Sequence, residues 1–244
     1  MVINPVLIDL GPLQIRWYGV LLVIGLIIGI WIFNKLAKER GINEKNRWDY
    51  IFWMIIGIFV GARLFHVFVY NFELFLENPL WIFYIWQGGI SSHGAIIGGI
   101  ITTLIFSKMR NINFYDLIDN VVVPAGLVGV FIRIGNFINV ELVGRVTDVA
   151  WAVKFEDYEG LRHPSQFYQA FKDLVIFGIM LFINSFKPKR GVLFWSFIVL
   201  FSLFRFTVEF YKDFPLYLGL TPGQLASIPF FIVGVVMLYK INMK

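Results

Sequence analysis

Polar side chains gather in one stretch of the sequence that follows a long apolar run. Residues 133–145 read Arg-Ile-Gly-Asn-Phe-Ile-Asn-Val-Glu-Leu-Val-Gly-Arg, directly after the apolar residues 121–132. Arg133 and Asn136 are three positions apart, so on a continuing helix they share one face and can reach the same ligand. A guanidinium group matches the geometry of a phosphate, and a side-chain amide adds orientation. The spacing therefore predicts a phosphate-binding site.

A second arginine, Arg205, lies near the end of another apolar run, four residues before Glu209. Charged side chains inside a membrane segment are costly and usually mark functional sites. Together with Arg133, Arg205 therefore predicts a phosphate site at the level of the lipid headgroups. The structural alternative, which stays open, is that Arg205 and Glu209 neutralise each other across one helical turn.

His93 lies in a turn, residues 88–94, that has glycines at positions 88, 89 and 94. Glycines leave the backbone exposed and let a substrate approach closely. Imidazole, with an unperturbed pKa of about 6.5, suits a general base. We therefore predict that His93 is a base or contacts the substrate, and the alternative is a buried imidazole that donates a structural hydrogen bond.

Other polar residues near the apolar runs receive structural interpretations. Arg63 is expected to pair with Asp119 inside the helix bundle. His66, at the end of an apolar run, is expected to pack at the membrane interface. His163 precedes Pro164, which suits the first turn of a helix.

The composition is that of an integral membrane protein. Of 244 residues, 58% are hydrophobic and 15% are charged, whereas a soluble domain carries about 25% charged residues. The net charge of +5 does not indicate nucleic-acid binding, because the basic residues cluster in short loops between apolar runs. The absence of cysteine excludes disulfides and cysteine nucleophiles. The three histidines lack metal-binding spacing, so no metal site is predicted.

Apolar runs that approach the length needed to cross a bilayer, about 20 residues, recur along the chain. Gly25 and Gly29 predict a close contact between two helices. Residues 71–87, which are rich in aromatic residues, are expected to form a short helix in the membrane interface. We predict one all-α integral membrane domain, residues 1–244, with about seven transmembrane helices near residues 17–33, 50–70, 88–107, 114–134, 165–186, 191–211 and 224–239.

Basic residues between these runs predict the orientation of the chain. The loop 34–49 is the richest in Lys and Arg, and by the positive-inside rule it faces the cytoplasm. The amino terminus is then outside and the carboxyl terminus inside. Residues 136–164 are too polar to cross the membrane and are expected to form a small extracytoplasmic insertion. Apolar side chains alternate along residues 149–155, which predicts some β structure in this insertion.

Several short motifs are spread along the chain besides residues 133–145: Ile15-Arg16-Trp17-Tyr18-Gly19, Gly61-x-Arg63, Trp86-Gln87-Gly88-Gly89-Ile90-Ser91-Ser92-His93-Gly94, His163-Pro164-Ser165-Gln166, Arg205-Phe206-x-x-Glu209-Phe210 and Gly223-Gln224-x-x-Ser227-x-Pro229. Taken together and in this order, they resemble the motifs of one protein family, the prolipoprotein diacylglyceryl transferases. Two positions depart from the family pattern: Ala95 stands where many relatives have glycine, and Phe201 stands where some relatives have tyrosine.

The resemblance implies a reaction between a lipid and an exported protein. The diacylglyceryl group of phosphatidylglycerol would pass to the lipobox cysteine thiol of a prolipoprotein signal peptide, forming a thioether and releasing glycerol phosphate. No cofactor and no nucleic acid would take part. The enzyme would be a multi-pass protein of the bacterial plasma (inner) membrane, with its active site toward the extracytoplasmic face.

Roles for individual residues follow from the matched motifs and the chemistry of the reaction. His93 would accept the thiol proton, while Arg133 and Arg205 would stabilise the charge on the departing phosphate. The residues expected to bind or position the substrate are Tyr18, Asn136, Asn139, Glu141, Gly144 and Glu209.

Two other classes of function use the same polar residues. A membrane transporter or binding protein for an anionic or phosphate-bearing solute would also need the arginines. Such proteins usually place polar groups at the membrane midplane and often have repeat symmetry, and neither pattern is evident in this sequence. A non-catalytic scaffold would leave the arginines unexplained.

Overall fold

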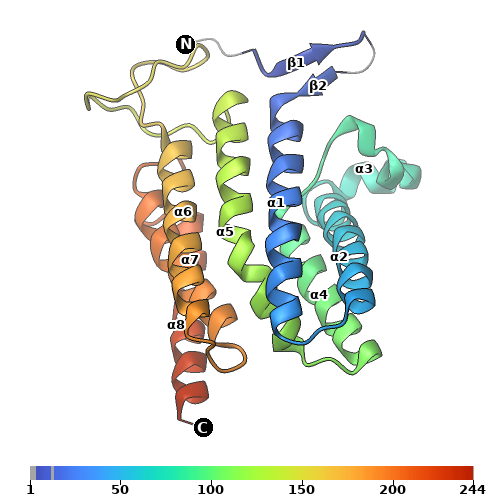
Figure 1. Ribbon diagram of the computed structural model, residues 1–244. Helices are drawn as coiled ribbons and strands as arrows, with labels where there is room; N and C mark the ends of the chain where they lie inside the picture. Colours follow the sequence, from blue (N-terminus) through green and yellow to red (C-terminus); the bar gives the residue numbers. More distant parts are fainter. Residues whose placement is uncertain (1–3, 12–13, 244) are drawn as a thin grey trace. The chain divides into compact units, whose positions relative to one another are not determined.

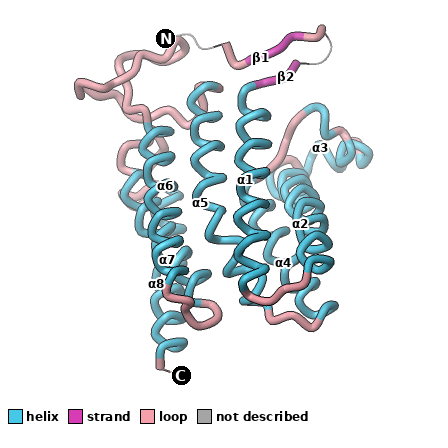
Figure 2. Tube along the Cα trace, in the orientation of Figure 1, coloured by secondary structure: helices cyan, strands magenta, loops and turns pink. Residues whose placement is uncertain are grey.

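A computed structural model describes residues 4–11 and 14–243 of the chain (Figure 1). These residues form two compact units, which are described separately below. The first unit contains the chain up to Phe33 and from Asp119 onward, and the second contains residues 34–118. Helices make up most of both units (Figure 2).

The first unit contains the helices that carry most of the predicted site residues. Helix α1 (Trp17–Glu39) begins in this unit and ends in the second, whereas α5 (Phe114–Ile138) begins in the second unit and ends here. The unit is completed by α6 (Ser165–Ser185), α7 (Val192–Glu209) and α8 (Pro222–Asn242).

Helices α1 and α5 approach closely because two glycines of α1 face α5, as predicted. A Cβ atom on Gly25 would lie 3.1 Å from the ring of Phe131, and one on Gly29 would lie 2.9 Å from Val128. Small residues of this kind let two helix backbones come together in a membrane. The contact fixes the start of α1, which carries Tyr18, relative to the end of α5, which carries Arg133.

A short hairpin precedes α1 and was not predicted from the sequence. Strands β1 (Val6–Asp9) and β2 (Gln14–Arg16) are antiparallel, with Ile8 opposite Ile15. The segments are only a few residues long and mostly exposed, so they lack the apolar alternation that marks a strand.

Helix α7 begins where a buried carboxylate of α5 caps it. Both carboxylate oxygens of Asp119 accept backbone hydrogen bonds, from Gly191 N at 2.8 Å and from Phe194 N at 2.9 Å. A negative charge at a helix N-terminus neutralises unpaired N–H groups and the helix dipole. Asp119, which is fully buried, was expected to pair with Arg63, and the structure gives both residues other partners.

The second unit is built on two helices, α2 (Glu44–Phe65) and α4 (Ser92–Arg110). Glycines line the contact on both sides: a Cβ on Gly61 would lie 2.7 Å from the Cα of Gly98, and one on Gly98 would lie 3.1 Å from the Cα of Gly61. The two backbones therefore touch without intervening side chains. Between these helices the chain forms a π-helical turn (His66–Tyr70), α3 (Phe72–Glu77) and two 3₁₀ turns (Pro79–Phe83 and Ile85–Gln87), so the expected short helical structure at residues 71–87 is present.

Within the described residues, six helical segments are long and apolar enough to cross a membrane: Trp17–Glu39, Glu44–Tyr70, Phe114–Ile138, Ser165–Ser185, Val192–Glu209 and Pro222–Asn242. At most 39% of the apolar window of any of these segments is buried inside the protein. The protein is therefore a multi-pass, mostly α-helical membrane protein. The remaining predicted span, residues 88–107, corresponds to α4, in which glycine, serine, threonine and basic residues dilute the apolar ones.

Residues 139–164 join α5 to α6 without forming a strand. Instead of the expected strand, residues 149–155 contain one residue in an isolated β-bridge, Val153, which pairs with Arg162. Arg162 also forms a β-bridge with Val146. A small apolar cluster of Phe137, Val143 and Phe155 holds this segment together. Of the alternating apolar residues, Phe155 belongs to this cluster and Val153 packs against it, whereas Trp151 is exposed. In Figure 1 this segment and the β1–β2 hairpin lie at the same end of the first unit, opposite the carboxyl terminus.

Candidate functional site

A chain of hydrogen bonds joins the polar residues at the end of α5. Arg133 Nη1 donates to Asn136 Oδ1 at 3.1 Å, which confirms that the two share one face of a continuing helix. Asn136 Nδ2 in turn donates to Glu141 Oε2 at 2.6 Å, and Asn139 Nδ2 donates to Glu141 Oε1 at 3.1 Å. The sequence neighbours Arg133, Asn136, Asn139 and Glu141 therefore form one network.

The chain reverses direction after α5, and the reversal brings Glu141 to this network. Val140 and Leu142 both have positive φ, 56° and 55°, a conformation that non-glycine residues rarely adopt. Glu141 N donates to Asn136 O at 2.8 Å, and the side chains of Gln166 and Ser165 bind the carbonyl groups of Glu141 and Leu142. The strained turn is thus held by bonds on both sides.

Tyr18 lies against the same end of α5. A Cβ atom on Gly135 would lie 2.7 Å from the Tyr18 ring, so only glycine fits beneath it. Tyr18, which is expected to bind or position the substrate, therefore lies beside the residues that follow Arg133.

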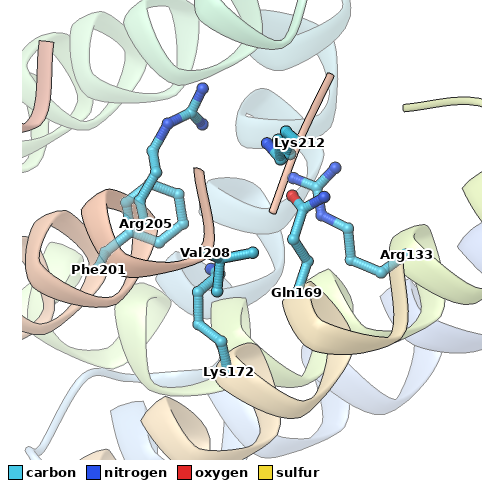
Figure 3. A pocket seen from close by; sticks show the side chains of 7 residues that line it. All are labelled: Arg133, Gln169, Lys172, Phe201, Arg205, Val208 and Lys212. Carbon is cyan, nitrogen blue, oxygen red and sulfur yellow. The ribbon is translucent and has the colours of Figure 1, made fainter. Parts of the chain in front are cut away.

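A pocket opens between α5, α6 and α7, and Arg133 forms part of its wall (Figure 3). Four cationic side chains line it: Arg133 from α5, Lys172 from α6, Arg205 from α7 and Lys212 just beyond α7. The structure thus brings the two predicted arginines to one pocket. Its remaining lining residues are Gln169, Phe201 and Val208.

Two buried carboxylates balance part of this positive charge. Asp173 forms an ion pair with its neighbour Lys172, and its Oδ2 lies 3.8 Å from Arg133 Nε. Glu209 Oε1 lies 2.6 Å from Lys212 Nζ and 3.7 Å from Arg205 Nη2. Among the described residues, neither arginine has a carboxylate oxygen closer than 3.7 Å, so both have donors available for an anionic ligand.

Glu209 is fully buried and has its closest contacts with residues other than Arg205. Its Oε2 accepts a hydrogen bond from Thr221 Oγ1 at 3.0 Å, and a Cβ on Gly223 would lie 2.7 Å from its Oε1. Burial lowers the pKa of Lys212 to about 8, although the hydrogen bond and charge of Glu209 act to raise it. Glu209 therefore anchors Lys212 and the start of α8, as well as facing Arg205.

Gly144 occupies a position where a side chain does not fit. A Cβ there would lie 2.7 Å from both the Cβ of His163 and the carbonyl oxygen of Tyr211. His163 itself lies against Tyr211 and forms a hydrogen bond between its Nδ1 and Tyr168 Oη at 3.0 Å. Close packing accounts for Gly144, and His163 precedes α6 as its sequence predicts.

The second unit carries His93 and the glycine turn. His93 is exposed at the start of α4, where its Nδ1 lies 3.3 Å from Tyr70 Oη and its ring stacks on Phe65. The turn before it is organised by Arg63, whose Nη1 donates to the carbonyl oxygens of Gly88 at 2.7 Å and Gly89 at 2.9 Å.

Arg63 makes three further hydrogen bonds to carbonyl groups, those of Ile82, Trp81 and Tyr84. It is therefore a structural residue, as expected, although carbonyl groups rather than Asp119 are its partners. His66 contacts Trp81 and Asn71, which agrees with its expected packing role. Across residues 4–11 and 14–243, His, Asp and Glu side chains form no group of three that could hold a metal ion.

Sequence reasoning missed four polar residues around the pocket: Gln169, Lys172, Asp173 and Lys212. The first three lie within residues 165–186, which were interpreted only as an apolar span. Two adjacent ionisable residues inside such a span are themselves a signal of a functional site. Lys212 carries no comparable signal, because it follows a span and resembles an ordinary interfacial cation.

The fold and the pocket together define a multi-pass α-helical membrane protein with a buried cationic site. The family model of prolipoprotein diacylglyceryl transferase matches residues 5–240. The chain belongs to this family, which supports neither the transporter nor the scaffold interpretation.

Relatives from several bacteria resemble the chain over nearly its whole length, and each bears the name phosphatidylglycerol–prolipoprotein diacylglyceryl transferase. The Geobacter sulfurreducens protein is 38% identical over 252 residues, covering 99% of this chain and 96% of its own. The Aeromonas hydrophila protein is 40% identical over 249 residues, covering 97% and 90%. The Rickettsia africae protein is 38% identical over 256 residues, covering 99% and 98%.

Proposed function

We propose that this protein transfers the diacylglyceryl group of phosphatidylglycerol to the lipobox cysteine thiol of prolipoprotein signal peptides. The names of its relatives support the lipid and the protein substrate. Four cationic side chains, including Arg133 and Arg205, line one pocket of a membrane protein, and this observation supports the assignment of the site. A lipid phosphate is the anion that a membrane supplies in quantity.

The reaction requires a thiolate, because a thiol with an ordinary pKa of about 8.5 is a poor nucleophile near neutral pH. His93 accepts the thiol proton. The sulfur then forms a bond to the glyceryl carbon that carries the phosphate ester, and the carbon–oxygen bond breaks. Both electrons of that bond leave with the oxygen, so the products are a thioether and glycerol phosphate.

The pocket stabilises the charge that accumulates on the departing phosphate. Arg133 and Arg205 donate to the phosphate oxygens, where fixed donors in a site shielded from water act strongly. Glu209 orients Arg205 across the 3.7 Å between them. The residues that position the headgroup are Tyr18, Asn136, Asn139 and Glu141, and Gly144 allows the chain that follows them to pack closely against His163.

The same proposal sets the topology of the chain. All seven long helices, α4 included, cross the bacterial plasma membrane, with the amino terminus outside. The active site then faces the extracytoplasmic side, where signal peptides emerge, and residues 136–164 form an insertion in a single membrane domain. The basic loop 34–49 supports this orientation.

The test is to measure release of glycerol phosphate from labelled phosphatidylglycerol by the purified protein, with and without a lipobox peptide. Release should require the peptide thiol. In Arg133→Ala the rate should fall about 100-fold, because one donor to the developing charge is lost. Arg110→Ala, which removes an exposed arginine paired with Asp49, is the matched control and should keep its rate.

Either of two results would refute the proposal. Wild-type protein that releases no glycerol phosphate in the presence of the peptide would exclude the reaction. A folded Arg133→Ala protein with an unchanged rate would exclude the phosphate site.

A further inference from the structure

Helix α6 contributes a side of the pocket that sequence reasoning did not identify. Gln169 and Lys172 are three residues apart, so they project from the same face of α6, and both line the pocket. Only 3% of Gln169 and 5% of Lys172 is exposed. In Figure 3 both side chains extend from α6 toward the space that Arg133 also lines.

Lys172 is held in place by two neighbours. It forms an ion pair with Asp173, and its ammonium nitrogen lies 4.3 Å from the centre of the Phe201 ring on α7. Both contacts stabilise a buried ammonium group. An ammonium has three N–H donors. Among the described residues Lys172 makes one hydrogen bond, to Asp173, which leaves donors for a ligand.

Two other N–H donors at the pocket have no hydrogen-bond partner among the described residues. Within the described part of the chain, Arg133 Nε and Gln169 Nε2 are buried and make no hydrogen bond. A buried donor without an acceptor is destabilising, and native proteins usually provide one. An oxygen-rich anion in the pocket would satisfy donors from α5 and α6 together.

The charge of the pocket also suits a phosphate. Its four cationic side chains face two carboxylates, Asp173 and Glu209, so two positive charges are in excess. Phosphatidylglycerol carries one negative charge on its phosphate, whereas glycerol phosphate, as a monoester with a second pKa of about 6, carries nearly two at neutral pH. The excess charge therefore matches the leaving group better than the substrate.

We propose that Lys172, with Gln169 beside it, is a third phosphate-binding residue of the transferase site and contacts the phosphate as glycerol phosphate leaves. This inference rests on the proposed function and adds α6 to the arginines of α5 and α7. The competing explanation is that Lys172 only neutralises Asp173.

A double variant separates these explanations. Lys172→Met alone would leave the Asp173 carboxylate buried and unpaired, so a loss of activity would be ambiguous. Lys172→Met combined with Asp173→Asn removes the pair as a unit and leaves the excess charge of the pocket unchanged. If Lys172 is only a counter-ion to Asp173, the double variant should regain the activity that Lys172→Met loses, because the two substitutions compensate each other.

The experiment measures kcat and KM for phosphatidylglycerol, and separately the affinity for glycerol phosphate by calorimetry. We expect the double variant to lose about 10- to 100-fold in kcat/KM, mainly in kcat, and to bind glycerol phosphate about 10-fold more weakly. Lys172→Arg, which keeps a cation at this position, should retain part of the wild-type rate. Lys240→Met, which removes an exposed lysine of α8, is the matched control. Thermal unfolding confirms that each variant is folded.

A folded double variant with wild-type kcat/KM and wild-type glycerol phosphate affinity would overturn the inference. The two readouts also separate it from the proposed function. If the wild-type protein lipidates no peptide, the proposed function fails, and weaker glycerol phosphate binding by the double variant would still support the role of Lys172. If lipidation proceeds and the double variant is unaffected, only the role of Lys172 fails.

Discussion

Replacing Glu209 by glutamine removes one negative charge while keeping the shape of the side chain. The amide oxygen can still accept the hydrogen bond that Thr221 donates at 3.0 Å. Lys212, 2.6 Å away and only 4% exposed, loses its counter-ion, and Arg205 loses the charge that faces it at 3.7 Å. We expect Glu209→Gln to be less stable than the wild type and less active.

The magnitude follows from the burial of the pair. Removing one partner of a buried ion pair costs roughly 3–5 kcal/mol, because the other charge stays buried without compensation. The cost depends on pH through Lys212, whose pKa falls from its ordinary 10.5 to about 8 in the folded protein. Above pH 8 the wild-type protein itself loses the Lys212 charge, so the cost of Glu209→Gln should shrink.

The sign of the wild-type pH dependence follows from the same shift. Between about pH 8 and 10.5 the unfolded chain binds more protons at Lys212 than the folded chain, so stability rises with pH across this window, by about 3 kcal/mol in total. In Glu209→Gln the pKa of Lys212 is lower still, because the carboxylate no longer favours the charged form. The rise should therefore begin at a lower pH.

The assay is thermal unfolding in detergent at neutral pH and again near pH 9.5, with lipidation kinetics on the same samples. Glu156→Gln, at an exposed position, is the matched control and should unfold like the wild type. Glu209→Gln combined with Lys212→Met should be more stable than Glu209→Gln alone, because no charge is left unpaired. Equal losses of stability at both pH values would refute the reasoning.

Two further predictions concern the two units separately. Gly135→Ala places a Cβ 2.7 Å from the Tyr18 ring, so we expect a KM for phosphatidylglycerol that is several-fold higher. Gly178→Ala, the control, adds a methyl group with nothing within 4 Å and should leave KM unchanged. An unchanged KM in both variants would exclude Tyr18 from the site. His93→Gln should lower the lipidation rate about 100-fold, because the group that accepts the thiol proton is lost. A near-normal rate would show that His93 is not the base.

The sequence predicts this structure well where one physical signal dominates. Long apolar runs predict the helices, because a membrane segment must satisfy its backbone hydrogen bonds internally. The spacing of Arg133 and Asn136 predicts that they share one helix face, and their hydrogen bond confirms it, since the helix continues to Ile138. Gly25 and Gly29 predict a close helix contact for a similarly local reason.

Prediction fails where tertiary contacts decide the outcome. Glu141 reaches Asn136 only through a reversal with positive φ at Val140, which no local preference of valine indicates. Arg63 binds five carbonyl groups contributed by residues 81–89, and a distant carboxylate was the simpler expectation. Lys172 was missed because the helix is apolar on average, and its one adjacent charged pair, Lys172 and Asp173, changes that average little.

The glycine contact between α2 and α4 has a mechanical consequence. Where side chains fill an interface, they can change rotamer and let two helices slide or tilt. Gly61 and Gly98 bring backbone against backbone, so this interface has almost no such freedom. The end of α2, which carries Arg63, and the start of α4, which carries His93, should therefore move as one rigid piece. If His93 is the base, as proposed, a motion of this unit that admits a substrate past His93 must then bend the turns that connect the two helices.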